Sequence, residues 1–312
     1  MEAAEPRGHA GPLLTAHIRS AGSRGEPVLR DVELKLWPGE TLLVLGPSGS
    51  GKTTLILALT GVLSGLLGGY VDGDVRLAGV DPATREGFEA VPRLVGVVLQ
   101  DPDKQISMPT PYDEVMFTLE NLGYPEEEAS ARTEEILRWA GLGDKMFREV
   151  ESLSGGEKKR LCIAASIVHG PRLLIFDEPT ANLDPRGVGS MLGYMERLRA
   201  RGYSMIVVEH KAGYFLGRAD RILVLDSGRV AMALEERPAA SELRGLEDLG
   251  IDTGLLRPRE RRRAVESEAM VELRGVSYRY RGARQYALRN VDLEVPKGSI
   301  YALVGHNGSG KT

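Results

Sequence analysis

Cysteine, net charge and long apolar runs are all scarce in this sequence, and each shortage excludes a class of protein. A single cysteine, Cys162, among 312 residues cannot form an intrachain disulfide, which fits a reducing compartment. No run reaches the ~18 apolar residues of a membrane-spanning helix, because the nearest one, residues 55–69, is broken by threonine, serine and glycine. The net charge of −4 leaves no basic footprint, so we expect no nucleic-acid partner.

The first residues, MEAAEPRGHAGP, have no basic region leading into an apolar core, so no signal peptide is expected. One basic cluster, RPRERRR, occupies residues 257–263. A solvated linker explains this cluster, and contact with acidic lipid or RNA is the alternative. The hydrophobic content of 42% is that of an ordinary globular core.

A domain-sized repeat is present. The stretches VLGPSGSGKTT from Val44 and VGHNGSGKT from Val304 both match the phosphate-binding pattern G-x-x-x-x-G-K-[ST]. Gly305 lies 305 − 46 = 259 positions after Gly46, and the same offset aligns VLRDVELKLWPGETLLVLG with ALRNVDLEVPKGSIYALVG. We therefore expect a first domain over residues 12–230, a tail and linker over 231–269, and the start of a second copy over 270–312, cut at its phosphate loop.

Short apolar runs alternate with helical stretches along the chain. The runs TLLVLG, LVGVVLQ, RLLIFDE, SMIVVEH and RILVLD are typical of parallel strands covered on both faces. Helices are expected after the first phosphate loop, over residues 112–140 and near 187–200. The fold class is therefore α/β, a P-loop NTPase sandwich with a mainly helical inserted subdomain over about 101–165.

The phosphate loops predict binding of a nucleoside triphosphate. Lys52 is expected to reach the β and γ phosphates, and the Thr53 hydroxyl to ligate magnesium. Asp177 and Glu178 follow an apolar strand, where Asp177 would hold magnesium through its water shell and Glu178 would polarise the attacking water. The candidate nucleotide-binding residues are Gly46, Ser48, Gly49, Ser50, Gly51, Lys52, Thr53 and Thr54, with Gly305, Gly308, Ser309, Gly310, Lys311 and Thr312 in the second copy.

The run LSGGEKKR at residues 153–160 places a serine and two glycines at a helix start, which forms a second anion-binding site. With it, the chain resembles the ATP-binding-cassette (ABC) ATPases, over nearly all of residues 25–230 and again from Met270. The resemblance implies a signature loop formed by Ser154, Gly155, Gly156 and Glu157. It also implies a Q-loop glutamine that binds magnesium, a D-loop aspartate and a switch histidine, namely Gln100, Asp184 and His210.

The catalytic set implied by this resemblance is Glu178, His210 and Gln100, and the metal set is Thr53, Gln100 and Asp177. Tyr280 in the second copy matches the aromatic residue that stacks on adenine. The first copy has no such aromatic in AHIRSAG, where only His17 could substitute.

What the resemblance implies about function is an ATPase that uses ATP and Mg²⁺ to power transport across a membrane. Its expected partners are integral membrane transporter subunits and a second ABC domain, with the chain peripheral on the cytoplasmic face of the membrane. Two segments, QDPDKQ with its second glutamine Gln105 and EVMFTLENLGYP, are most similar to energy-coupling-factor and cobalt-type importers. We expect residues 105–112 to line the groove that accepts a helix of the membrane partner.

Two other function classes remain open on the sequence. Soluble tandem ABC proteins that act on ribosomes also lack membrane spans, but they usually carry a long charged helical linker, whereas this linker has prolines and little helical periodicity. DNA-maintenance ATPases would interrupt the domain with a coiled coil or zinc-binding cysteines, and neither pattern is present.

Overall fold

The computed structural model describes residues 11–23, 25–235, 238–254, 268–281, 285–305 and 309–311. They form two compact units. The first holds the described residues within 1–181 and 190–255, and the second holds those within 182–189 and 256–312.

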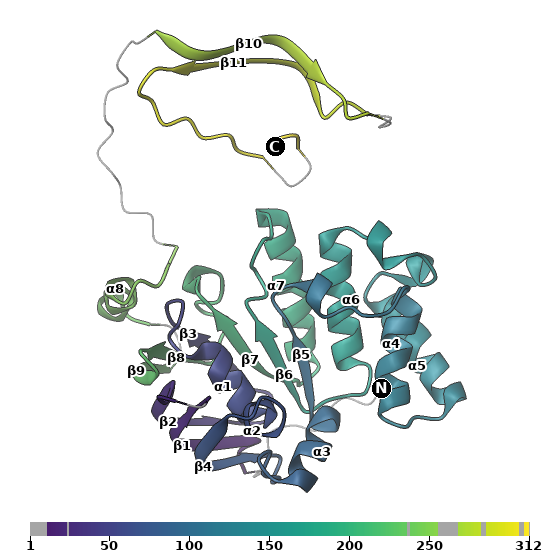
Figure 1. Ribbon diagram of the computed structural model, residues 1–312, viewed down its shortest axis with the longest axis vertical. Helices are drawn as coiled ribbons and strands as arrows, with labels where there is room; N and C mark the ends of the chain where they lie inside the picture. Colours follow the sequence, from purple (N-terminus) through teal and green to yellow (C-terminus); the bar gives the residue numbers. More distant parts are fainter. Residues whose placement is uncertain are drawn as a thin grey trace. The chain divides into compact units, whose positions relative to one another are not determined.

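A six-stranded sheet forms the centre of the first unit (Figure 1). Its order is β5 (Val95–Val98), β6 (Leu173–Asp177), β7 (Ser204–Glu209), β3 (Thr41–Leu45), β8 (Arg221–Asp226) and β9 (Arg229–Glu235). All neighbours pair in parallel except β8 and β9. Five of these strands are the apolar runs identified in the sequence, and the α/β P-loop fold class is confirmed.

A second, antiparallel sheet was not anticipated from the sequence. It has the order β2 (Leu29–Leu36), β1 (Leu14–Gly22) and β4 (Tyr70–Leu77). Leu14, Ala16 and Ile18 alternate inward from β1 and join one apolar core with residues of α1 (Lys52–Leu59) and β3. Helix α1 is thereby held by the core that both sheets share.

Helices cover the central sheet and build the helical subdomain. They are α2 (Val62–Gly65), α3 (Arg85–Leu94), α4 (Pro111–Asn121), α5 (Glu126–Trp139), α6 (Gly155–Ile167), α7 (Pro185–Ala200) and α8 (Ala240–Asp248). Single 3-10 turns lie at η1 (Pro102–Lys104), η2 (Gly143–Lys145), η3 (Val150–Ser152) and η4 (Ala212–Tyr214). In Figure 1, α4, α5 and α6 gather at one side of the sheet. No helix among the described residues is long and apolar enough to cross a membrane.

The helical region expected over 112–140 consists of two helices, which are separated where Gly123 adopts a positive φ and Pro125 precedes α5. On α6, Cys162 is 1% exposed, and burial raises the pKa of its thiol to about 12. This buried thiol is therefore a core residue of the helix.

The chain continues to pack on the first unit beyond residue 230. Leu246 of α8 and Ile251 are buried. The carbonyl of Asp252 accepts the amide of Ala212 at 2.8 Å, two residues after His210. This tail is therefore joined to the segment that follows the predicted switch histidine.

In the second unit, β10 (Ala269–Tyr278) and β11 (Leu288–Pro296) form an antiparallel ribbon. Strand β11 matches β2 at the repeat offset. Residues 300–304, which match β3, are not a strand, because the described part of this unit supplies no neighbours like β7 and β8. One contact is nevertheless common to the two matching stretches: Lys311 Nζ donates to the Gly305 carbonyl at 2.7 Å, as Lys52 Nζ does to that of Gly46.

One glycine turn offers a test of the fold. Gly228, between β8 and β9, has φ +77°, and a Cβ there would lie 1.8 Å from the Val28 carbonyl oxygen. Gly228→Ala should therefore lower the free energy of unfolding by about 2–3 kcal/mol. Gly193→Ala, in the middle of α7 with open space around it, should raise that free energy by about 0.5–1 kcal/mol. Urea unfolding of both variants checks this, and equal midpoints would contradict it.

Candidate nucleotide site

The first phosphate loop connects β3 to α1 and leaves the start of the helix open. Gly51 precedes α1 with φ +103°, and a Cβ there would come within 2.8 Å of a Leu29 methyl group, so glycine is required. No side chain caps α1, and its first turn contains no acidic residue. The unpaired amides and the positive end of the helix dipole are therefore available to an anion.

The Lys52 ammonium lies inside this loop. The residue is 6% exposed, and its Nζ donates to the carbonyl oxygens of Gly46 at 2.7 Å and Pro47 at 2.8 Å. Burial lowers the pKa of Lys52, and the carboxylates of Glu178 and Asp177 oppose that shift. These carboxylates favour the charged ammonium where the β and γ phosphates are expected.

The two acids lie at the end of β6, beside the loop. Burial raises the pKa of Asp177, and the neighbouring charge of Glu178 raises it further. A nearby cation would favour the ionised form of Asp177. Glu178 has φ +45°, a left-handed conformation that costs a non-glycine residue about 1–3 kcal/mol. Such strain persists only where neighbouring contacts hold the backbone.

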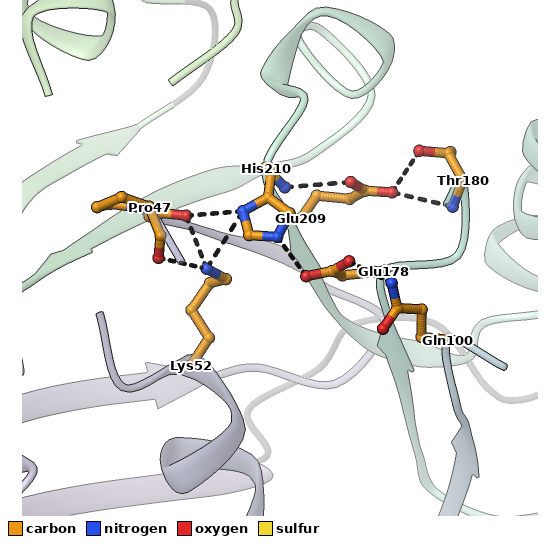
Figure 2. A network of polar contacts seen from close by, with 8 residues as sticks. Pro47, Lys52, Gln100, Glu178, Thr180, Glu209 and His210 are labelled. Atoms are coloured by element: carbon orange, nitrogen blue, oxygen red, sulfur yellow. Dashed lines mark hydrogen bonds and ion pairs between the residues drawn. The ribbon is translucent and has the colours of Figure 1, made fainter. Parts of the chain in front are cut away.

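The other two predicted catalytic residues both contact Glu178 (Figure 2). Its Oε1 contacts Nε2 of His210, and its Oε2 accepts the side-chain amide of Gln100 at 2.8 Å. The other ring nitrogen of His210 lies 3.1 Å from the Gly46 carbonyl oxygen. His210 thus spans the phosphate loop and the carboxylate.

A pocket of about 280 Å³ brings most of the predicted site together. The Ser50 hydroxyl, in the same loop, is buried and has no hydrogen-bond partner in the described structure. An orphaned donor in a loop of open amides fits an incoming phosphate. The pocket is lined by Val28, Ser48, Gly49, Gly51, Lys52, Thr53, Thr54, Asp177, Glu178 and His210.

Comparison with known proteins identifies the family. The model of the ABC transporter family matches residues 29–181. A protein of Pyrococcus abyssi, provisionally named an ABC transporter ATP-binding protein, is 40% identical over 224 residues, which are 72% of this chain and 80% of that protein. The chain belongs to the ABC transporter ATP-binding proteins.

The other matches agree with this family. A provisionally named ABC transporter ATP-binding protein of Methanosarcina acetivorans is 31% identical over 292 residues, 93% of this chain and 55% of that protein. The chain spans about half the length of the first curated relatives it matches. The structure of CbiO1 from Clostridium perfringens, described as part of the ABC transporter complex CbiONQ, has a TM-score of 0.64 and 28% identity, and the match covers 72% of this chain and 88% of that one.

The donor set of the ABC domain fits magnesium bound together with phosphates. The described residues contain no group of three or more His, Cys, Asp or Glu side chains that could hold a metal. Thr53 and Asp177 both line the pocket, and Mg²⁺ is commonly bound by one or two protein oxygens, phosphates and waters. Gln100, the third predicted ligand, contacts Glu178 instead and is absent from the pocket lining.

The signature residues form a helix start separate from the pocket. The Ser154 hydroxyl accepts the amide of Glu157 at 3.4 Å, and the Glu157 carboxylate accepts the amide of Ser154 at 2.9 Å, a reciprocal cap of α6. Lys145 donates to Glu157 and, with the Ser154 amide, lowers the pKa of Glu157 to about 2. Ser154, Gly155 and Gly156 are exposed, and none lines the pocket.

The remaining predicted residues lie in three places. Asp184 accepts the amide of Gly187 at 2.7 Å at the start of α7. Tyr280 is 56% exposed and packs edge-to-face on Tyr278 within the second unit. His17 lies in β1 beside Glu33 and does not line this pocket. Gly308 and Thr312 are outside the described residues.

Sequence reasoning missed three residues around the site. Val28, 40% exposed, supplies the apolar lining of the pocket. Glu209 ends β7 beside His210, and Lys159 lies on α6 within the signature run; both are buried. A charged residue closing an apolar strand in IVVEH was the available signal for Glu209.

The geometry predicts separate defects for the acid and the lysine. Glu178→Gln should keep nucleotide binding and lower turnover at least about 100-fold, because an amide cannot act as a base. Lys52→Ala should weaken ATP binding itself, because it removes the cation buried in the loop. Equilibrium binding and phosphate release measure the two effects.

Glu89→Gln provides the control, since that side chain is 65% exposed on α3. A Glu178→Gln protein that keeps most of its steady-state turnover would rule out this role for the carboxylate.

Proposed function

We propose that the chain binds and hydrolyses ATP and drives a membrane transporter, of the importer type similar to energy-coupling-factor systems. It would act as a peripheral subunit on the cytoplasmic face of the membrane, together with integral membrane subunits. The family match and the likeness to a subunit described as part of a transporter complex support this proposal. The importer subfamily rests on the sequence segments around Gln105.

The observation that carries the proposal is the placement of Glu178 between His210 and Gln100. His210 also reaches the phosphate loop, and Gln100 leads directly into a surface loop. Loss of the γ-phosphate can therefore alter the position of the surface loop through the Glu178 carboxylate and the Gln100 amide.

Hydrolysis would use the chain's own groups as follows. Lys52 and the α1 amides bind the β and γ phosphates, and Thr53 and Asp177 hold magnesium, which when bound neutralises part of the phosphate charge. Glu178 orients and polarises the attacking water. Because Glu178 contacts His210 and Gln100, its position depends on both.

The surface loop after Gln100 has a groove beside it. Its side is formed by Ile106, Ser107, Met108 and Pro109, and the Glu114 carboxylate fixes this stretch by accepting the amides of Ser107 and Met108 at 2.9 Å each. The groove has a volume of about 670 Å³ and is further lined by Asp103, Glu149, Val150, Glu151 and Lys158.

Gln105 does not line this groove. Its side chain turns inward, accepting the amide of Leu99 at 2.8 Å and donating to the carbonyl of Val97 at 2.9 Å. Of the expected segment 105–112, residues 106–109 are therefore the ones we propose to contact a helix of the membrane partner.

Crosslinking tests the coupling role. Cysteines introduced as Ser107→Cys and Met108→Cys should crosslink to the membrane subunit, and ATP should change the yield, because the loop is tied to Glu178 through Gln100. Arg85→Cys on α3, a side chain 87% exposed outside the groove, is the matched control. Equal or absent crosslinking at both places would remove the coupling role and favour the soluble, ribosome-acting alternative.

We further propose that the complete ATP site needs the signature loop of another ABC domain. Ser154, Gly155 and Gly156 are exposed at the start of α6 and do not line the pocket of their own domain. The amides of Ser154 and Glu157 already donate within the helix cap, so the amides of Gly155 and Gly156 are the ones available to cap a nucleotide held elsewhere.

Dilution tests this requirement. Turnover per chain should fall as the chain is diluted and should rise when a separate ABC domain with an intact signature loop is added. A demonstrated monomer that hydrolyses ATP at a constant rate per chain over the same range would contradict it.

A further inference from the structure

The turn that carries Glu178 depends on contacts that the catalytic set does not explain. Glu178 has φ +45°, and Pro179 follows it, so the backbone is both strained and restricted. The Glu178 amide donates to the Val208 carbonyl at 2.9 Å, and the Ala181 amide donates to the Glu178 carbonyl at 3.0 Å. These two bonds leave Pro179 and Thr180 to be fixed by other groups.

Glu209 fixes Thr180. It is 2% exposed at the end of β7, and its Oε1 accepts both the amide and the hydroxyl of Thr180, the amide at 2.9 Å. Its Oε2 accepts the amide of His210 at 3.1 Å. In Figure 2 one carboxylate thus joins the turn after Glu178 to the backbone of the switch histidine.

Lys159 fixes the residues on either side of Thr180. It is 5% exposed on α6, five positions after Ser154, and its Nζ donates to the carbonyl oxygens of Pro179 at 2.8 Å and Ala181 at 3.0 Å. Burying an ammonium group costs free energy, and its hydrogen bonds to two carbonyl oxygens fix the position of those carbonyls. The turn is therefore also joined to the helix that begins at the signature loop.

We propose that Glu209 and Lys159 are positioning residues that hold the turn at residues 178–181 so that the Glu178 carboxylate faces the phosphate pocket. The Glu209 carboxylate accepts hydrogen bonds from Thr180. The Lys159 ammonium donates to the carbonyl oxygens of Pro179 and Ala181. The direction of Glu178 is consequently fixed by two elements, strand β7, which ends one residue before the switch histidine, and helix α6, which begins at the signature loop. This inference rests on the proposed ATP hydrolysis, but not on transport.

The test compares Glu209→Gln and Lys159→Gln with the unmodified protein in its intact, ATP-hydrolysing assembly. In Glu209→Gln, an NH₂ group replaces one of the two carboxylate oxygens that accept hydrogen bonds. This NH₂ donor would then face another donor, an N–H or O–H group of His210 or Thr180. We expect kcat to fall about 10- to 100-fold in each variant, because a misplaced reacting group costs rate rather than affinity. KM for ATP and the nucleotide Kd should change less than about 2-fold, since neither residue lines the pocket.

A double-mutant cycle distinguishes positioning from a general structural role. In a Glu178→Gln background, neither substitution should lower the residual turnover further, because both act through that carboxylate. Matched controls are Glu89→Gln and Lys35→Gln, both at exposed positions.

Three results would overturn the inference: unchanged kcat in both variants, equal losses of kcat and nucleotide affinity, or full additional losses in the Glu178→Gln background. If Lys159→Gln unfolds below the assay temperature, Glu209→Gln and Lys159→Arg supply the same comparison, with Arg expected to retain more turnover than Gln. Absence of hydrolysis by the unmodified assembly would instead count against the proposed function.

Discussion

The burial of one ammonium group, that of Lys52, is the constraint on which the rest of the site depends. A cation that is 6% exposed must have its protons accepted and its charge balanced. The loop carbonyls of Gly46 and Pro47 accept the protons, and the acids after β6 supply the opposite charge. This arrangement requires β3 and β6 to end at the same edge of one parallel sheet, with β7 paired between them. The order of the strands therefore places the carboxylates after β6 beside the Lys52 ammonium.

The wider charge pattern around that lysine is uneven. Three carboxylates, Asp177, Glu178 and Glu209, influence the Lys52 ammonium, whereas Lys159 interacts with Glu209 from α6. Their mutual repulsion contributes to the raised pKa of Asp177. A triphosphate alone would add to this negative charge, and a divalent cation offsets it. The donor chemistry and the electrostatics are therefore compatible with the proposed magnesium, which among the described residues would have no preformed carboxylate cage.

The sequence was sufficient to predict those elements that are specified by a short, local pattern of residues. The phosphate loop, the acids after β6 and the five apolar strands follow from short patterns, because two-sided burial and phosphate binding need fixed residue types. The antiparallel sheet was not predicted, because LTAHIRSAG mixes polar and apolar residues. Its partner strand, residues 70–77, also lies far away in the sequence. The inward turn of Gln105 and the contacts of Lys159 and Glu209 were equally invisible, because each depends on tertiary proximity between segments far apart in the chain. Tertiary polar contacts carry no periodic signal.

The lysine-to-glycine contact of the phosphate loop occurs in two different settings. Lys311 reaches the carbonyl of Gly305 at 2.7 Å although residues 300–304 are not a strand, whereas Lys52 makes the same contact beside a fully paired β3. The ammonium therefore reaches the glycine carbonyl six positions earlier whether or not a strand precedes the loop.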